Sequence, residues 1–233
     1  MRILSLDTST SLASVALVMD ERIVAESIFT CDRTLSGRLM PEVERLLALG
    51  GLSAGDIDLF AAAIGPGSFT GVRCGVATVQ GLSLATDRPC TGFSTLAMLA
   101  MNFPFSSLPV CPLLDARKGE VYAGLYDCSA PIPSPLIDDC VIPPERLLDR
   151  LAGLTDTTVI FAGEGAVRYH DAIAARMGER AVFAPFPHNS GRAGNGALLA
   201  RSAFEHGRAF SDPSRLLPVY IRPSEAELAA RRG

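Results

Sequence analysis

The sequence contains one lysine, three histidines and no tryptophan. The lysine, Lys118, precedes a glycine instead of following one, so the chain lacks the Gly-Lys pair of a Walker-type phosphate loop. His170, His188 and His206 are spaced too widely to place two zinc ligands on one helix face. These absences exclude Walker-type nucleotide hydrolases and argue against a zinc site built from histidines.

Charge and aromatic content argue against a nucleic-acid-binding protein that acts alone. The 25 acidic side chains outnumber the 21 basic ones, for a formal net charge of -4. Such a chain repels a polyanion at long range, and eleven phenylalanines and four tyrosines offer little surface for base stacking. No apolar run approaches the roughly 18 residues that span a bilayer, so we expect no membrane association.

The cysteines form no Cys-x-x-Cys pair and are far apart in the chain. They occur at Cys31, Cys74, Cys90, Cys111, Cys128 and Cys140. Most lie in apolar runs, which is typical of reduced, partly buried thiols. The apolar N-terminal stretch is interrupted by Asp7, too early for a signal peptide. We therefore expect a cytoplasmic protein.

The first part of the chain predicts a β-meander followed by an amphipathic helix. Short β-type runs at 2–6, 13–19 and 23–29 are joined by polar turns. From about residue 36 to residue 49 the apolar positions follow a helical period, and Gly50-Gly51 ends the pattern. Proline at position 41 favours a start of the regular helix nearer Leu39.

A buried strand at 58–64 leads into a glycine-rich turn at 65–71 and a second helix at 72–86. No charged residue lies between Arg73 and Asp87, so this helix lacks an ordinary solvated face. Two interpretations remain open. Either its own domain buries the helix completely, or a partner chain covers one side.

The second half repeats this plan. A strand at 110–114, a turn led by Asp115 and a strand at 121–126 precede a strand at 157–162, Gly163-Glu164-Gly165 and a helix near 167–177. We predict a duplicated α/β chain with an N-terminal lobe at 1–108 and a C-terminal lobe at 109–233. The proline-rich stretch 129–144 is interpreted as a loop-rich insertion. Helices are expected at 193–206 and 225–232, the last one reaching back across the lobes.

The turn after the first strand and the glycine-rich turn are candidates for anion or nucleotide binding. Free amides at a helix start could hold phosphate, and a nearby carboxylate could hold its magnesium through water. The candidate residues are Asp7, Thr8, Ser9, Gly65, Gly67, Ser68, Thr70, Gly71 and Arg73. Helix capping and turn formation explain the same residues equally well. The turn also fails as a Rossmann fingerprint, because its third glycine is one residue late and Pro66 occupies it.

Residues for catalysis are not apparent. The chain has no Gly-x-Ser-x-Gly elbow, no His-Glu-x-x-His, and no histidine before His170. We therefore assign no catalytic residue and no metal ligand.

Four segments together resemble the bacterial TsaB family, and the match runs through nearly the whole chain in order. They are Leu6-Asp7-Thr8-Ser9, Gly65-Pro66-Gly67-Ser68-Phe69-Thr70-Gly71-Val72-Arg73-Cys74-Gly75, Asp115-Ala116-Arg117-Lys118-Gly119-Glu120-Val121-Tyr122 and Pro218-Val219-Tyr220-Ile221-Arg222. The resemblance implies a two-lobed actin-like ATPase fold of duplicated ribonuclease-H-like units, with mixed sheets flanked by helices.

It also implies a partner subunit rather than an enzyme. Family members pair with a homologue, TsaD, which transfers a threonylcarbamoyl group from its adenylate to an adenosine beside the anticodon of tRNA, and an ATPase subunit, TsaE, joins them. TsaD carries two metal-binding histidines on its first helix, whereas the matching stretch Leu35–Met40 contains none. Many TsaB sequences begin this helix with His-Ser-Glu instead of Leu35-Ser36-Gly37, a departure that we expect to affect capping only. ATP or ADP with magnesium at the complex interface, and tRNA contact within the complex, are compatible with this role.

The family's dimer interface uses the first two long helices. Carried onto this sequence, the expected contact residues with TsaD, or with a second copy in its absence, are Leu39, Met40, Val43, Leu46, Leu47, Val72, Val76 and Val79. Two other classes stay open: an ATP-dependent phosphotransferase of the same fold, and a glycoprotein-directed peptidase. ATP turnover lost on Asp7→Ala would favour the former, and chelator-sensitive proteolysis the latter.

Overall fold

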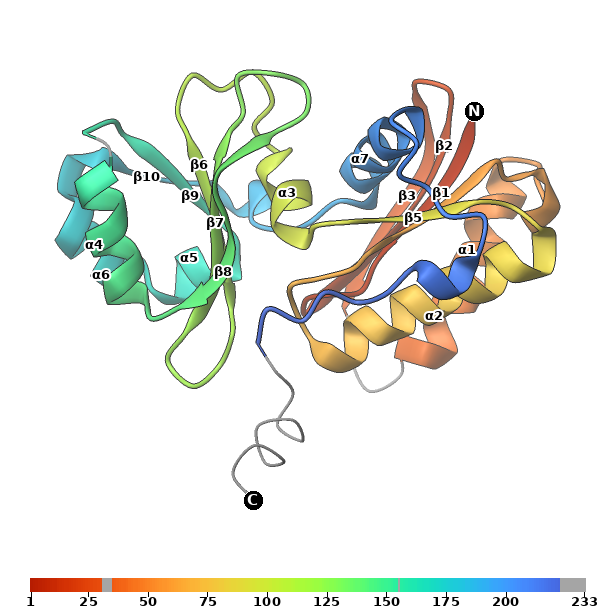
Figure 1. The fold of residues 1–233 in the computed structure, drawn as a ribbon, viewed down its shortest axis with the longest axis horizontal. Coiled ribbons are helices and arrows are strands. Elements are labelled where there is room, and N and C mark those ends of the chain that lie inside the picture. Colours follow the sequence, from red (N-terminus) through yellow and green to blue (C-terminus); the bar gives the residue numbers. More distant parts are fainter. Residues whose placement is uncertain (31–34, 155, 223–233) are drawn as a thin grey trace.

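The computed structural model describes residues 1–30, 35–154 and 156–222, which form two lobes side by side (Figure 1). Cys31 and the helix expected at 225–232 lie outside these residues. Each lobe is one five-stranded sheet flanked by helices (Figure 1).

The first sheet has the strand order β3-β2-β1-β4-β5. Its strands are β1 (Arg2–Asp7), β2 (Leu12–Met19), β3 (Arg22–Thr30), β4 (Leu59–Ala63) and β5 (Cys90–Phe93). The first three pair antiparallel, which confirms the predicted meander, and β1, β4 and β5 run parallel. β4 is buried along its whole length, as expected of a central parallel strand.

The second sheet repeats this topology, with the order β8-β7-β6-β9-β10. Its strands are β6 (Val110–Asp115), β7 (Val121–Asp127), β8 (Ser134–Ile142), β9 (Val159–Ala162) and β10 (Ala181–Phe183). Again the first three strands pair antiparallel, and the first, fourth and fifth run parallel. The shared order and strand directions confirm the duplication.

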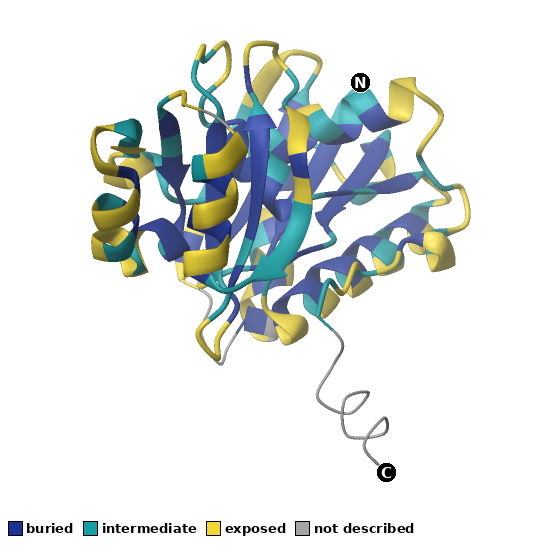
Figure 2. Ribbon diagram, turned by 60° about the vertical axis from the view of Figure 1, so that its left-hand side comes forward, coloured by how far each residue is buried: buried dark blue, intermediate teal, exposed yellow. Residues whose placement is uncertain are grey.

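Helices cover both sheets. The first is flanked by α1 (Leu35–Leu49), α2 (Phe69–Thr86) and α7 (Ala193–Glu205), and the second by α3 (Thr95–Ala100), α4 (Pro144–Leu154), α5 (Glu164–Arg168) and α6 (His170–Met177). Short 3-10 turns lie at Ala54–Asp56, Gly178–Arg180, Phe186–His188 and Pro213–Arg215. The flanking helices are buried toward the sheets and exposed on their outer sides (Figure 2).

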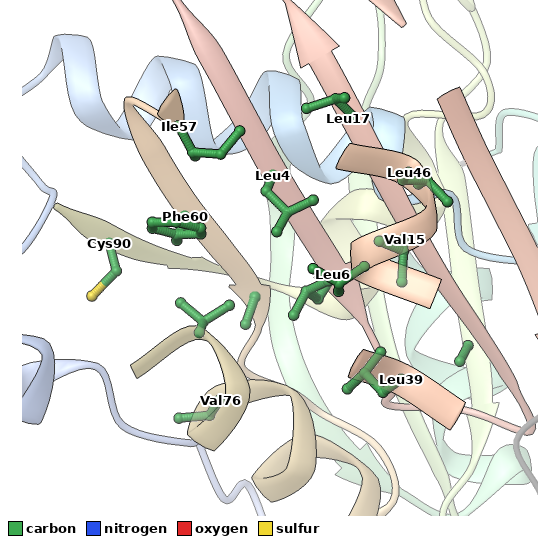
Figure 3. Close-up of a cluster of buried hydrophobic side chains, with 14 of the residues drawn as sticks. Leu4, Leu6, Val15, Leu17, Leu39, Leu46, Ile57, Phe60, Val76 and Cys90 are labelled. Carbon is green, nitrogen blue, oxygen red and sulfur yellow. The ribbon is translucent and has the colours of Figure 1, made fainter. Parts of the chain in front are cut away.

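The largest core cluster lies between the first sheet and the α1/α2 pair, where Leu4, Leu6, Phe60 and Val76 meet (Figure 3). On the other face of the same sheet, Ile3 and Leu59 pack with Ala197 of α7. The two-sided cover makes this sheet the rigid base from which the turn after β1 projects.

Three expectations about the elements were wrong. Residues 134–142 are the strand β8 rather than a loop, because at the edge of the sheet the missing N–H of Pro135 breaks no ladder. α1 begins at Leu35 despite Pro41, because the Gly37 carbonyl that loses its partner is exposed to water. The helix expected at 167–177 is divided into α5 and α6 at Tyr169.

The lobe boundary also differs from the simple division at 108/109. α7 belongs by sequence to the second half, yet it packs on β1, β2, β4 and β5 of the first sheet. Residues 208–222 also run back along the first lobe, where Phe210 pairs with Cys90 in an antiparallel bridge. The first lobe is thus completed by the end of the chain.

Candidate functional site

β1 ends in a buried carboxylate, whose hydrogen-bond partner lies in the following turn. Asp7 accepts hydrogen bonds from the Ser9 amide (2.9 Å) and from the Ser9 hydroxyl (2.6 Å). Only 1% of Asp7 is exposed, and this burial raises its pKa above the ordinary value, opposed by the two Ser9 hydrogen bonds. Asp7 is therefore more readily neutral than a surface aspartate.

The glycine-rich segment packs directly on this turn. The Thr8 hydroxyl donates to the Gly71 carbonyl (2.7 Å), and a Cβ on Gly71 would collide with the Thr8 carbonyl. A Cβ on Gly75 would lie 2.5 Å from Thr8 Oγ1, and one on Gly67 would collide with the Ser9 carbonyl. The glycines thus let the start of α2 approach the turn with no side chain between them.

The donors of the glycine-rich turn are partly used within the lobe. The Ser68 amide donates to the Ser9 carbonyl (2.7 Å), and the Gly71 amide donates to the Ser68 hydroxyl (3.3 Å), which caps α2. An anion could bind only to the remaining amides at the helix start. The structure brings Asp7, Thr8 and Ser9 against this turn, and anion or nucleotide binding there stays a prediction.

Gly65 and Arg73 contact the C-terminal segment instead. A Cβ on Gly65 would lie 2.8 Å from the Val219 carbonyl. The Arg73 guanidinium lies 3.7 Å from the centre of the Phe69 ring, and its Nε donates to the Tyr220 hydroxyl (2.6 Å). Thr70 is exposed beside this stack.

A cleft of about 750 Å³ separates these turns from the matching hairpin of the second lobe. Its lining includes Ser9, Thr10, Ser11, Gly67, Ser68, Thr70, Gly71, Cys74, Asp115, Arg117, Tyr122 and Glu164. The Ser11 hydroxyl donates across it to Glu164 (3.1 Å). Asp115 pairs with Arg168 (2.9 Å) and, more loosely, with Arg117 (3.8 Å). The cleft is thus lined by hydroxyls, by the carboxylates of Asp115 and Glu164, by the Arg117 guanidinium and by apolar side chains such as Leu114.

No group of three or more His, Cys, Asp or Glu side chains that could hold a metal ion occurs in the part of the chain that the structure describes. In that same part, no helix is long and apolar enough to cross a membrane.

Most of the expected contact residues on the first two helices lie inside the lobe, so that expectation was wrong. The side chains of Leu39, Leu46 and Val76 extend into the core between the sheet and the helices (Figure 3). Val43, Leu47, Val72 and Val79 are buried in the same cluster. The apolar period marked the face that each helix turns toward its own sheet. Met40, 37% exposed, alone of these residues stays accessible.

The outer faces of α1 and α2 present different residues. On α2 they are Phe69, Thr70, Arg73, Ala77, Gly81, Leu84 and Ala85, and on α1 they include Met40, Ala48 and Leu49 beside the charged Arg38, Glu44 and Arg45. Leu84 is 74% exposed and Leu49 62%. The absence of charged residues between Arg73 and Asp87 indicated this outer face of α2. A search for large apolar residues missed the face because many of its side chains are small.

The C-terminal segment is the part that sequence reasoning did not assign to the site. The Gln80 side chain donates to the carbonyls of Pro213 (3.1 Å) and Leu216 (2.9 Å), and the Val219 amide donates to the Ile64 carbonyl (2.8 Å). Arg222 then crosses to the second lobe and donates to the Ala116 carbonyl and the Glu120 carboxylate. The segment ties both lobes together beside the cleft.

Comparisons with known proteins agree with this architecture. The family model described as "TsaD: tRNA N6-adenosine threonylcarbamoyltransferase" matches residues 24–191. The chain is 41% identical over 128 residues to the tRNA threonylcarbamoyladenosine biosynthesis protein TsaB of Escherichia coli, which covers 54% of this chain and 55% of that protein. The solved structure of YeaZ from Pseudomonas aeruginosa superposes with a TM-score of 0.81 at 32% identity, over 94% of this chain and 99% of that one.

A more distant likeness concerns the fold alone. A ROK hexokinase from Thermus thermophilus superposes with a TM-score of 0.50 at 12% identity, over 89% of this chain and 100% of the other. It confirms the predicted two-lobed actin-like ATPase fold.

The tRNA threonylcarbamoyladenosine biosynthesis protein TsaB of Bacillus subtilis is 31% identical to this chain over 229 residues, which cover 97% of this chain and 96% of that protein. The chain therefore belongs to the TsaB family.

Proposed function

We propose that the protein is a non-catalytic partner subunit in tRNA threonylcarbamoyladenosine biosynthesis, which binds and stabilises the catalytic subunit TsaD. Membership of the TsaB family supports the pathway, because the relatives carry that pathway in their names. The match to the TsaD family model supports a partner of the same fold, since homologous subunits often associate through equivalent surfaces.

One observation carries the partner role: the outer face of α2 is exposed and carries no charged residue between Arg73 and Asp87. Solvent-facing helix surfaces normally carry charged residues, and an apolar face without them marks an interaction site. Ala77, Gly81 and Ala85 allow a second helix to approach closely, while Leu84 and Leu49 supply apolar area. We therefore place the interface on the outer residues of α1 and α2, with Met40 retained from the sequence prediction.

The same face would serve a homodimer when TsaD is absent. In the complete assembly, TsaE joins the pair, ATP or ADP with magnesium binds at a subunit interface, and tRNA contacts mainly the partner. The acidic charge of this chain supports the last point, because phosphate contacts need basic surface.

Reconstitution tests the proposal. Purified TsaD, TsaE and the threonylcarbamoyl-adenylate synthase are incubated with tRNA and substrates, with and without this chain, and the modified adenosine is measured by mass spectrometry. We expect modification only with the chain present, a raised melting temperature of TsaD in the mixture, and no turnover of ATP by the chain alone. Equal modification without the chain, or ATP turnover by the chain that Asp7→Ala removes, would contradict the proposal.

A further inference from the structure

A second groove, distinct from the cleft lined by Ser9 and Gly67, lies between α3, β8 and the C-terminal segment. It consists of two cavities of about 390 and 430 Å³. The cavities adjoin each other, because Ile64, Ser94, Ala97 and Pro133 line both. Elsewhere the walls are largely apolar, and among them are Phe93, Leu199, Phe210, Leu216, Val219 and Ile221.

The two ends of the groove carry opposite charge. Arg208 and Arg215 line the first cavity, whereas Asp138 and Asp139 line the second. Within the residues that the structure describes, neither arginine forms an ion pair, although Asp212 lies near Arg215 in the chain and accepts hydrogen bonds from Ser214. The Arg215 guanidinium lies 5.1 Å from the centre of the Phe210 ring, so the positive charge open to an occupant at this end is mainly that of Arg208.

The acidic end is fixed in position. Asp139 accepts hydrogen bonds from the Tyr126 hydroxyl and from the Ser94 hydroxyl, one on each carboxylate oxygen. Ser94 also caps α3 by accepting from the amides of Leu96 (3.1 Å) and Ala97 (3.2 Å). Asp138, next to this carboxylate, is exposed and makes no ion pair with any described residue, so it is available to a basic group.

The walls are equally well held. The Phe210 amide donates to the Cys90 carbonyl (2.7 Å), and the Cys90 amide donates back to Phe210 (2.9 Å). The hydrogen bonds of Gln80 to Leu216 and of Val219 to Ile64 secure the rest of the segment to the first lobe. A groove formed before binding costs its occupant little ordering of the protein.

We propose that this groove binds an extended peptide segment of a partner protein. The segment is apolar in its middle, with an acidic residue beside Arg208 and Arg215 and a basic residue beside Asp138. A compact ligand could fill one cavity but would leave the other end uncovered, whereas an extended chain contacts both charged ends and the apolar floor. The inference does not depend on the proposed role with TsaD, which uses α1 and α2.

Peptide selection tests this directly. A phage-displayed library of random twelve-residue peptides is selected on the full chain, and the strongest peptide is synthesised with a fluorophore for anisotropy titration. We expect selected peptides to share an apolar centre with an acidic residue on one side and a basic residue on the other. Failure to enrich any such pattern overturns the proposal.

Charge reversal then locates the site. Arg208→Glu with Arg215→Glu should weaken the peptide at least tenfold, and a peptide with its acidic residue changed to lysine should recover affinity on this variant. Asp138→Arg should weaken binding in the same way, because it repels the basic residue of the peptide. This variant keeps the test valid if the double variant fails to fold. Arg146→Glu with Arg150→Glu, the same charge change on the exposed side of α4, should leave affinity within twofold. Equal binding to all variants overturns the proposal.

A chain shortened to end at Arg222 tests whether the groove binds a partner or the protein's own C-terminal residues. If the peptide binds the shortened chain at least tenfold more tightly than the full chain, the C-terminal residues occupy the groove and the partner proposal is wrong. Equal affinity supports a partner.

Discussion

Thr8 and Gly71 are locked together: the Thr8 hydroxyl donates to the Gly71 carbonyl, while the Thr8 carbonyl fills the space where a Cβ on Gly71 would lie. This contact joins the turn after β1 to the first turn of α2. It gives the glycine-rich segment a structural purpose that is independent of any ligand.

We therefore expect Gly71→Ala to destabilise the protein, by about 1–3 kcal/mol for overpacking against backbone that cannot move aside. Gly153→Ala in α4 is the control, because a Cβ there meets nothing within 4 Å and α4 lies outside the proposed interface. Alanine at that exposed helical position should stabilise by about 0.5–1 kcal/mol. Urea unfolding of both variants measures the difference, and equal midpoints would contradict the packing role.

The outer face of α2 gives a prediction about association. Leu84→Asp and Ala77→Arg should weaken the complex with TsaD at least tenfold, because each places a charge on the uncharged face. Their unfolding midpoints should stay close to that of the unchanged protein, since both residues are exposed. Sedimentation velocity measures the first effect and circular dichroism the second.

Val76→Asp is the informative contrast, because Val76 is 3% exposed in the core. It should unfold the chain instead of only dissociating it, since an unpaired charge would be buried. A folded Val76→Asp protein with weakened association would restore the interface that was first expected from the sequence.

Periodicity predicted which helices lie beside the sheet but assigned the wrong side of them to the partner. Leu39 and Val76 belong to the periodic apolar positions of their helices because they face the first sheet. This periodicity gives no information about what covers the opposite side of each helix. The missing charge between Arg73 and Asp87 carried the information about the outer face. The meander and the duplication were predictable because both depend on local patterns.

The features that could not be predicted from the sequence depend on contacts between distant parts of the chain. Nothing local in Pro135 or its neighbours indicates that β8 finds a partner in β7 at a sheet edge. Likewise the return of α7 to the first sheet, and of Arg222 to the hairpin at Ala116, joins residues about a hundred or more positions apart. Such pairings are decided by the packed lobes and not by local propensity.

The buried carboxylate of Asp7 predicts a pH effect. Its pKa is raised in the folded protein, so the folded state holds this proton more tightly than the unfolded state. Stability from this group is complete below the unfolded pKa and is lost as the pH rises through the folded pKa. Asp7→Asn keeps an oxygen for both Ser9 hydrogen bonds without the charge. Its stability relative to the unchanged protein should therefore increase with pH.

Urea titrations at several values between pH 3 and pH 8 measure this trend. Asp127→Asn is the control with the opposite sign, because hydrogen bonds from Ser129 lower the pKa of Asp127. The Asp127 carboxylate stabilises the folded state above its unfolded pKa, and this contribution is lost on acidification. The stability of Asp127→Asn relative to the unchanged protein should therefore decrease as the pH rises. Parallel curves for Asp7→Asn and the unchanged protein would show that burial does not perturb Asp7.

Arg222 predicts how firmly the lobes are held. Its guanidinium donates to the Ala116 carbonyl and the Glu120 carboxylate, while Val219 of the same segment is bonded to the first lobe. Arg222→Ala should cost about 1–2 kcal/mol, less than a fully buried charged pair because Glu120 is 34% exposed. Hydrogen exchange of the amides in the 115–121 hairpin should become faster, since the hairpin loses its tie to the first lobe. Arg201→Ala breaks exposed pairs with Glu205 of the same helix and with Glu21, so it should leave stability nearly unchanged and should not alter exchange in the hairpin. Unchanged exchange in Arg222→Ala would mean that the packed sheet surfaces, and not this segment, hold the lobes in place.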